Sequence, residues 1–198
     1  TACLFWCAST LVPFAFAIAG LWQKRYTEWI KPALPWALIS FSILGTGIIM
    51  GAMWAYESLT FGGYWNWDPV ENASVLPWLI LGAGIHGMVI YNSTQKAAHA
   101  TIVLILLAFL SVLYATFLTR SGVLGDSSVH SFTDLGLSGQ LLLWMLFFIG
   151  FSVFLVIRTW SKFKSNNDED KLSARAFWMF LGYVVFFLSA IHIVLVRS

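Results

Sequence analysis

An aromatic- and glycine-rich segment, residues 61–72, contains the side chains with the clearest capacity for chemistry. It reads Phe-Gly-Gly-Tyr-Trp-Asn-Trp-Asp-Pro-Val-Glu-Asn. Broad, flat and partly polar faces are offered by Tyr64, Trp65 and Trp67. Gly62 and Gly63 let a large planar molecule approach the backbone. These residue types in this order predict a platform for a flat amphipathic ligand, and haem is the leading candidate.

The end of this segment also has a purely structural interpretation. Asp68 is expected to be the N-cap of a helix, Pro69 suits the first helical position, and Glu71 completes a capping-box-like arrangement. Both acids would favour the positive end of the helix dipole. On this interpretation Trp65 and Trp67 only anchor the chain at a membrane interface. The two interpretations are compatible, because a stable cap would also hold the loop rigid over a ligand.

The composition is that of a membrane protein. Of 198 residues, 59% are hydrophobic and 10% are charged, whereas about a quarter of a soluble domain is charged. The 11 Trp and 17 Phe residues fit aromatic belts at both interfaces of a lipid bilayer. The net charge of +2 carries no sign of nucleic-acid binding. The two cysteines, Cys3 and Cys7, form no C-x-x-C-H motif, so we do not expect a c-type cytochrome.

Six apolar segments are long enough to cross a bilayer, which takes about 17–25 residues. They cover approximately 2–22, 35–54, 75–92, 99–118, 137–157 and 176–196. Because lipid offers no hydrogen-bond partners to the backbone, these spans must be helices. We therefore predict an all-α polytopic membrane protein, with about six transmembrane helices in a single domain over residues 1–198.

The cationic residues divide unequally between the connections. Nine lie in 23–34, 92–98 and 158–175, and only Arg120 and Arg197 lie on the opposite side. The positive-inside rule then predicts that both ends of the chain are non-cytoplasmic. It also places two outer loops, about 57–74 and 119–136, on the same face of the membrane. Since the chain begins at Thr1 without a charged leader, we expect an internal piece of a longer protein.

The aromatic loop resembles the tryptophan-rich WWD signature of haem-handling membrane proteins, roughly W-G-x-x-W-x-W-D-P-x-E. The chain departs from it at Phe61, where the signature usually has Trp. The ending Asp-Pro-Val-Glu-Asn-Ala-Ser resembles the cytochrome c maturation protein F (CcmF) family. So do Met53-Trp-Ala-Tyr-Glu57 and Thr119-Arg-Ser-Gly-Val-Leu124. The resemblance covers about residues 10–135, and beyond 137 it depends on hydropathy.

His86 is predicted to lie deep in the bilayer, roughly 25 Å along the third span from Pro69. An intramembrane histidine suggests function, and the alternative is a core histidine bonded to a neighbouring helix. Gly82 and Ala83 leave the adjacent helix surface bare, so a macrocycle could pack there, although small residues equally promote helix packing. The resemblance implies that His86 is an axial ligand of an intramembrane b-type haem, with its partner ligand in a later part of the protein.

The second outer loop contains His130 and Arg120. An isolated loop histidine is usually only solvated, but the resemblance implies that His130 ligates a haem held transiently at the outer loops. Its partner ligand would lie upstream of Thr1. Arg120 could pair with a haem propionate or serve as an interfacial anchor. His99 and His192 match no motif, and we expect them to be structural.

The resemblance implies a component of c-type cytochrome biogenesis in the bacterial inner membrane, with the WWD loop facing the periplasm. It would accept haem from a periplasmic haem chaperone and present it to apocytochrome c, together with thiol-handling maturation subunits. No residue looks like a nucleophile or general base, so the contribution would be positioning. One alternative is a haem exporter of the two-component system, whose motif more often reads Asp-Pro-Lys-Glu, unlike Val70 here. Another is a six-helix scaffold that binds no haem.

Overall fold

The computed structural model describes residues 2–58, 63–65, 67–121, 136, 138–162, 181–182, 184–186 and 188–189. The described residues form helices and connections, and they contain no strand. The helices are α1 (Ala2–Trp22), α2 (Ile30–Ser58), α3 (Pro69–Thr94), α4 (Ala98–Arg120), α5 (Ser138–Thr159) and the short 3₁₀ helix η1 (Trp160–Lys162). The predicted all-α class is confirmed for this part of the chain.

The helices are longer than several of the predicted spans. α2 covers 30–58 where 35–54 was expected, and α3 covers 69–94 where 75–92 was expected. The reason is that a helix continues past its apolar stretch until a cap or a turn stops it. The connection between α2 and α3 is therefore shorter than the expected outer loop 57–74.

Four helices, α2 to α5, are long and apolar enough to cross a membrane, and α1 contains a shorter apolar stretch, Ser9–Trp22. The chain is thus a multi-pass membrane protein. The predicted sixth span, 176–196, lies mostly outside the described residues, although 181–182, 184–186 and 188–189 are helical. Six spans with both termini outside the cytoplasm stay a prediction.

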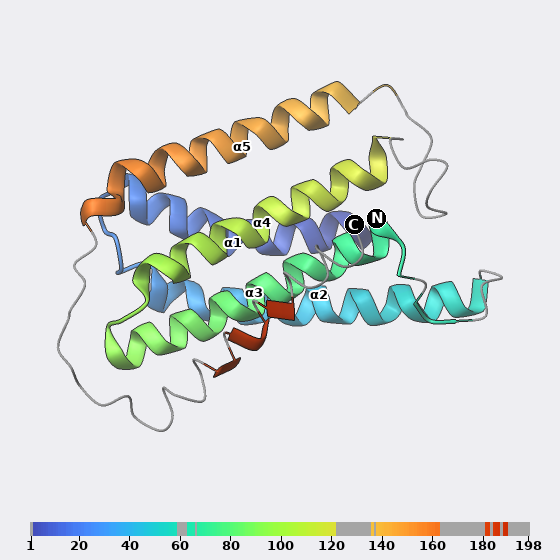
Figure 1. Ribbon diagram of the computed structural model, residues 1–198, viewed down its shortest axis with the longest axis horizontal. Coiled ribbons are helices and arrows are strands. Elements are labelled where there is room, and N and C mark those ends of the chain that lie inside the picture. Colours follow the sequence, from blue (N-terminus) through green and yellow to red (C-terminus); the bar gives the residue numbers. More distant parts are fainter. Residues whose placement is uncertain are drawn as a thin grey trace.

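The helices lie side by side along their lengths (Figure 1). α2 ends, α3 begins, α4 ends and α5 begins at one end of this bundle, and the α1–α2 connection, the α3–α4 turn and η1 are at the other. The second end gathers the described cationic residues Lys24, Arg25, Lys31, Lys96, Arg158 and Lys162. Arg120 is at the first end, where α4 stops. The charge asymmetry seen along the sequence is therefore an asymmetry between the two ends of the bundle.

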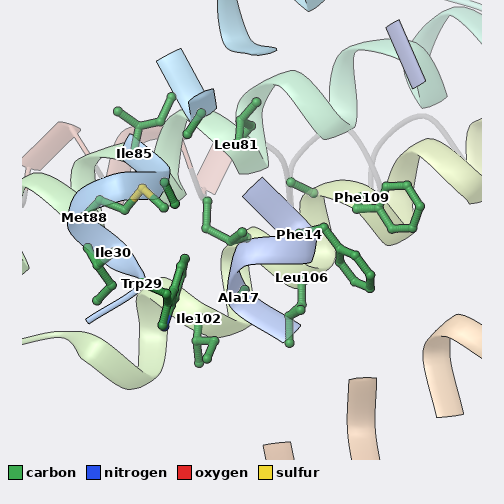
Figure 2. Packing of buried hydrophobic residues seen from close by; sticks show 14 of the residues in the cluster. Phe14, Ala17, Trp29, Ile30, Leu81, Ile85, Met88, Ile102, Leu106 and Phe109 are labelled. Carbon is green, nitrogen blue, oxygen red and sulfur yellow. The ribbon is translucent and has the colours of Figure 1, made fainter. Parts of the chain in front are cut away.

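The core forms where α1, α3 and α4 meet (Figure 2). Phe14 of α1 packs against Phe109 of α4, with ring centroids 4.4 Å apart. Leu81 and Met88 of α3 are completely buried. Since lipid tails are as apolar as these side chains, close van der Waals packing holds the helices together rather than expulsion of water. The buried stripe therefore marks where helices touch one another.

Glycines on α3 allow the close approach of α4. A Cβ placed on Gly87 would lie 2.6 Å from Oγ1 of Thr101, and one on Gly84 would lie 2.8 Å from Cδ1 of Ile105. Both distances are well inside ordinary contact. The α3–α4 pair, joined by the short turn at 95–97, is thus built around positions where no side chain fits.

α2 is fastened to its neighbours by hydrogen bonds and ring stacking. The Ser40 hydroxyl donates to the Ser9 carbonyl oxygen of α1 at 2.6 Å. On the other side, Trp78 Nε1–H of α3 donates to the Phe41 carbonyl oxygen at 3.1 Å, and the two rings stack with centroids 4.8 Å apart. These contacts fix the rotation of α3 about its own axis, and so the direction of its side chains.

Gly87→Ala is expected to destabilise the protein by about 1–3 kcal/mol, because the new methyl group overpacks the contact with Thr101. Gly150→Ala is the matched control, since a Cβ at Gly150 meets nothing within 4 Å. It should be neutral or stabilising by up to about 1 kcal/mol through helix propensity. Thermal unfolding of the detergent-solubilised protein measures both changes, and equal midpoints would contradict the packing argument.

Candidate functional site

The first turn of α3 is held by Asp68. Its Oδ1 accepts hydrogen bonds from the backbone N–H groups of Val70 and Glu71, both at 2.8 Å. Asp68 has extended backbone angles, φ −76° and ψ 162°, and is buried, with Pro69 following at the first helical position. The predicted N-cap is confirmed. The aromatic loop therefore leads into a rigidly fixed helix start.

Trp67, just before the cap, has a left-handed backbone conformation with φ +58°. Such a conformation is unfavourable for a bulky side chain and persists only where the surroundings impose it. The Trp67 side chain is 51% exposed, and its ring meets that of Trp65 edge to face, with centroids 6.2 Å apart. Trp67 thus combines an unfavourable backbone conformation with an exposed indole ring at this end of the bundle.

Tyr64 ties the loop to the end of α2. Its ring stacks on Tyr56 with centroids 4.3 Å apart and 12° between the planes, and both side chains are exposed. Gly63 beside it is open, since a Cβ there would meet only the Trp65 carbonyl oxygen at 3.9 Å. The described part of the loop therefore presents aromatic faces and accessible backbone together. Sequence analysis did not single out Tyr56, although it lies in the Met53-Trp-Ala-Tyr-Glu57 motif.

Where this loop meets α3, two buried polar atoms have no hydrogen-bond partner among the described residues. They are the indole Nε1 of Trp65 and the amide Oδ1 of Asn72. Asn72 is only 6% exposed, and its Nδ2 donates to the Trp67 carbonyl oxygen at 3.4 Å. Buried donors and acceptors are nearly always paired in folded proteins, so such exceptions often mark sites completed by another molecule. Sequence analysis did not select Asn72 as a site residue, because its burial is not visible in the motif.

His86 is half-buried on α3. Its Nδ1 bonds the Gly82 carbonyl oxygen, one turn earlier, at 2.8 Å. Because a carbonyl oxygen only accepts, Nδ1 is the donor, and the lone pair of the neutral ring is on Nε2. A histidine that ligates a metal typically has this arrangement, with one nitrogen donating to a carbonyl and the other free to bind.

The helix surface beside His86 is less bare than expected. A Cβ on Gly82 would lie 3.1 Å from Cε2 of Phe41 and 3.2 Å from two carbons of Phe186. The Phe186 ring also contacts the imidazole, with centroids 5.3 Å apart. Aromatic rings from α2 and from the last described segment therefore cover the glycine, which favours the helix-packing alternative at that position.

The remaining described site residues lie either at the loop end of the bundle or in the interior of α3. Glu71 is buried in its first turn, and Arg120 is exposed at the same end of the bundle. His86 lies about 25 Å further along α3, so the loop and the imidazole are separate sites. Gly62 and His130 lie outside the described residues, as does His192. His99 contacts the other end, where its Nε2 is 3.2 Å from the Trp160 carbonyl oxygen, which suits the expected structural role.

Fold and site together define a multi-pass helical membrane protein with an aromatic surface at one end and a histidine inside a spanning helix. Residues 4–124 match the family described as cytochrome C assembly protein. The chain is 42% identical to the cytochrome c-type biogenesis protein CcmF of Pseudomonas fluorescens over 149 residues, or 74% of the chain and 22% of that protein. The chain belongs to the CcmF family of cytochrome c assembly proteins, as its motifs predicted.

Two further comparisons extend the match. CcmF of Escherichia coli (strain K12) is 36% identical over 189 residues, covering 94% of the chain and 29% of that protein. A solved structure, cytochrome c heme lyase CcmF, is similar with a TM-score of 0.75 and 31% identity, covering 99% of the chain and 29% of the solved chain. The chain therefore spans between a fifth and a third of the length of these relatives.

Asp68→Ala is expected to destabilise the protein by about 1 kcal/mol, because two N–H groups of the first turn lose their acceptor. Asp68→Asn keeps a side-chain oxygen in the same place and should remain close to the wild-type midpoint. Thermal unfolding followed by circular dichroism distinguishes the two. If Asn were as damaging as Ala, the carboxylate charge rather than the cap would be what matters.

Proposed function

We propose that the complete protein is the haem-lyase component of cytochrome c maturation. It accepts haem from a periplasmic haem chaperone and presents it to apocytochrome c, assisted by thiol-handling maturation subunits. Family membership supports this proposal, and so do the names of the relatives, which speak of cytochrome c biogenesis and haem lyase. The same names favour it over a haem exporter.

The observation that carries the proposal is the hydrogen bond between His86 and the Gly82 carbonyl oxygen. A histidine meant only for packing would need a partner for each ring nitrogen in the bilayer. Among the described residues, His86 instead bonds Nδ1 to its own helix, and Nε2 makes no hydrogen bond and keeps its lone pair for another partner. A b-type haem ligated there would supply electrons that keep the iron of the transferred haem reduced. α3 contributes the orientation and tautomer of the imidazole.

The outer haem is the substrate, and we propose that the aromatic loop holds it. Trp67 and Tyr64 are exposed and able to stack on a macrocycle. Among the described residues the buried Nε1–H of Trp65 has no acceptor, and a propionate that enters the loop would supply one. Arg120 at the same bundle end can pair with a propionate through charge-assisted bonds. The cap at Asp68 and the buried Glu71 keep this surface rigid. The resemblance assigns Gly62 to the same surface and His130 to the iron.

The chemistry asks little of the protein beyond position. Each cysteine thiol of the apocytochrome adds across a vinyl C=C of haem, so that a C–S bond forms and the thiol hydrogen ends on carbon. This addition involves no net oxidation or reduction. A loop that fixes the vinyl groups and excludes water lowers the entropic cost of bringing each thiol and vinyl group into a reactive orientation.

The distribution of charge supports the orientation that this function needs. Apart from Arg120, the described cationic residues gather at the bundle end away from the loop, and cytoplasmic connections are the ones enriched in Lys and Arg. We therefore infer that the loop faces the periplasm of a bacterial inner membrane. There it meets the haem chaperone and the apocytochrome.

His86→Ala in the complete protein, purified in detergent, is expected to lose the reduced b-type absorption band. His130→Ala should keep that band and capture less of the haem-loaded chaperone. His99→Ala is the control for removing an imidazole, because His99 contacts Trp160 at the opposite end. It should change neither the spectrum nor the capture. Wild-type protein without any haem would refute the proposal and favour the scaffold alternative.

Trp65→Phe is expected to reduce capture of the haem-loaded chaperone while leaving thermal stability unchanged, because the lost N–H has no partner in the part of the chain that the structure describes. Trp78→Phe is the matched control. It removes an N–H that bonds the Phe41 carbonyl oxygen, so it should lower stability by about 0.5–1.5 kcal/mol and leave capture unchanged. Pull-down of the chaperone and a melting curve provide the two measurements. The role of the Trp65 donor would be disproved by unimpaired capture.

A further inference from the structure

Two aromatic rings and two glycines form a reciprocal contact between α3 and the last described segment. His86 and Gly82 lie one turn apart on α3, and Gly182 and Phe186 are likewise four residues apart on a helical segment. A Cβ on Gly182 would meet the His86 ring, and a Cβ on Gly82 would meet the Phe186 ring. The ring of each helix therefore packs against a glycine of the other. Because the later residue, Phe186, meets the earlier one, Gly82, the segment runs antiparallel to α3 (Figure 1, red).

The contact at Gly182 involves the nitrogen that is left for ligation. A Cβ built there would lie 2.7 Å from both Nε2 and Cδ2 of His86, and 3.6 Å from Cε1. Ordinary contacts between non-bonded carbon atoms are about 3.5–4.0 Å. Any side chain at position 182 would therefore press on the edge of the ring that contains Nε2 and Cδ2. Only glycine leaves that edge free while the two helices stay in contact.

The imidazole has little freedom to avoid such a side chain. Its Nδ1–H is committed to the Gly82 carbonyl oxygen, and the Phe186 ring packs beside it at 5.3 Å. A methyl group at 182 would either rotate the ring, which breaks that hydrogen bond and turns the lone pair away, or push the segment off α3. The first outcome loses the ligand geometry at Nε2, and the second removes the Phe186 packing that helps to hold the ring.

We propose that Gly182 is a positioning residue for the intramembrane ligand His86, because its missing side chain keeps Nε2 open to an axial bond and holds the ring in place. This inference rests on the proposed function, since it takes haem iron as the partner of Nε2. It adds a residue from the predicted sixth span to a site that sequence analysis placed on the third span alone.

Gly182→Ala in the complete protein is the experiment. We expect about a 10-fold weaker retention of the b-type haem, the scale typical for disturbing a group that orients a metal ligand. The haem that remains should shift from a low-spin towards a high-spin spectrum. Haem per protein and the reduced spectrum are measured in detergent, alongside wild type and His86→Ala.

Gly84→Ala is the matched control for overpacking. It creates a collision of similar depth on α3, 2.8 Å from Cδ1 of Ile105, but on the side that faces α4. It should lower the melting temperature while the folded protein keeps its full haem content and low-spin spectrum. If Gly84→Ala lost haem as severely as Gly182→Ala, the effect would be general destabilisation, and the inference would be wrong.

A second measurement tests the contact without haem. In the haem-free His86→Ala protein, adding Gly182→Ala should cause little further loss of thermal stability, because the ring that it collides with is gone. Gly182→Ala alone could fail to accumulate in cells. The double variant, which lacks the His86 ring, should then accumulate as well as His86→Ala does. If the double variant failed as Gly182→Ala does, the inference would be wrong. If Gly182→Ala retained all of its b-type haem, this inference would be wrong and the proposed function would stand. If His86→Ala retained the b-type haem, both the inference and the proposed function would be wrong.

Discussion

Close contacts that only small residues permit hold α3 in place, and both candidate sites depend on them. Gly84 and Gly87 bring α4 against one side of α3, and Gly45 of α2 receives the Trp78 indole on another. In a bilayer the apolar side chains gain nothing by leaving lipid, so backbone approach and dense packing must supply the attraction. A helix held in this way has a fixed rotation. The first turn of α3 therefore meets the aromatic loop, and His86 faces the segment that contains Gly182.

Most buried polar groups of the described helices have hydrogen-bond partners, and the few that do not are informative. Within the described helices, hydroxyl groups such as those of Thr101, Thr116 and Thr159 donate to carbonyl oxygens one turn earlier in their own helices, as groups shielded from water must. The unpaired Trp65 Nε1 and Asn72 Oδ1 depart from this rule at the loop end. A third unpaired atom, Ser152 Oγ on α5, lies outside both candidate sites. The first two share one loop–helix junction, and this junction is where the proposed function requires a ligand.

One helix connects the two proposed haem positions. The loop ends at the Asp68 cap and His86 lies about 25 Å further along α3, so the separation of the two sites follows from the number of residues between them. The unfavourable backbone conformation of Trp67, with φ +58°, is confined to the loop end, where the proposed function has its exposed indole stack on haem. The glycine contacts stay in the spanning part. In the proposed function, this division lets the loop accommodate a substrate while the imidazole keeps its orientation.

Much of this protein follows from the sequence alone, because local rules decide it. Apolar length predicted the helices, the order Asp68-Pro69 predicted the cap, and the spacing of tryptophans and glycines indicated the family. Helix ends were wrong where a cap, rather than the first apolar residue, set the boundary, as at the Asp68 cap that starts α3. Only the tertiary structure brought Phe186 onto Gly82 and Gly182 onto His86, or left Asn72 Oδ1 without a partner. No local rule contains these facts, since they depend on how helices far apart in the sequence cross and rotate against one another.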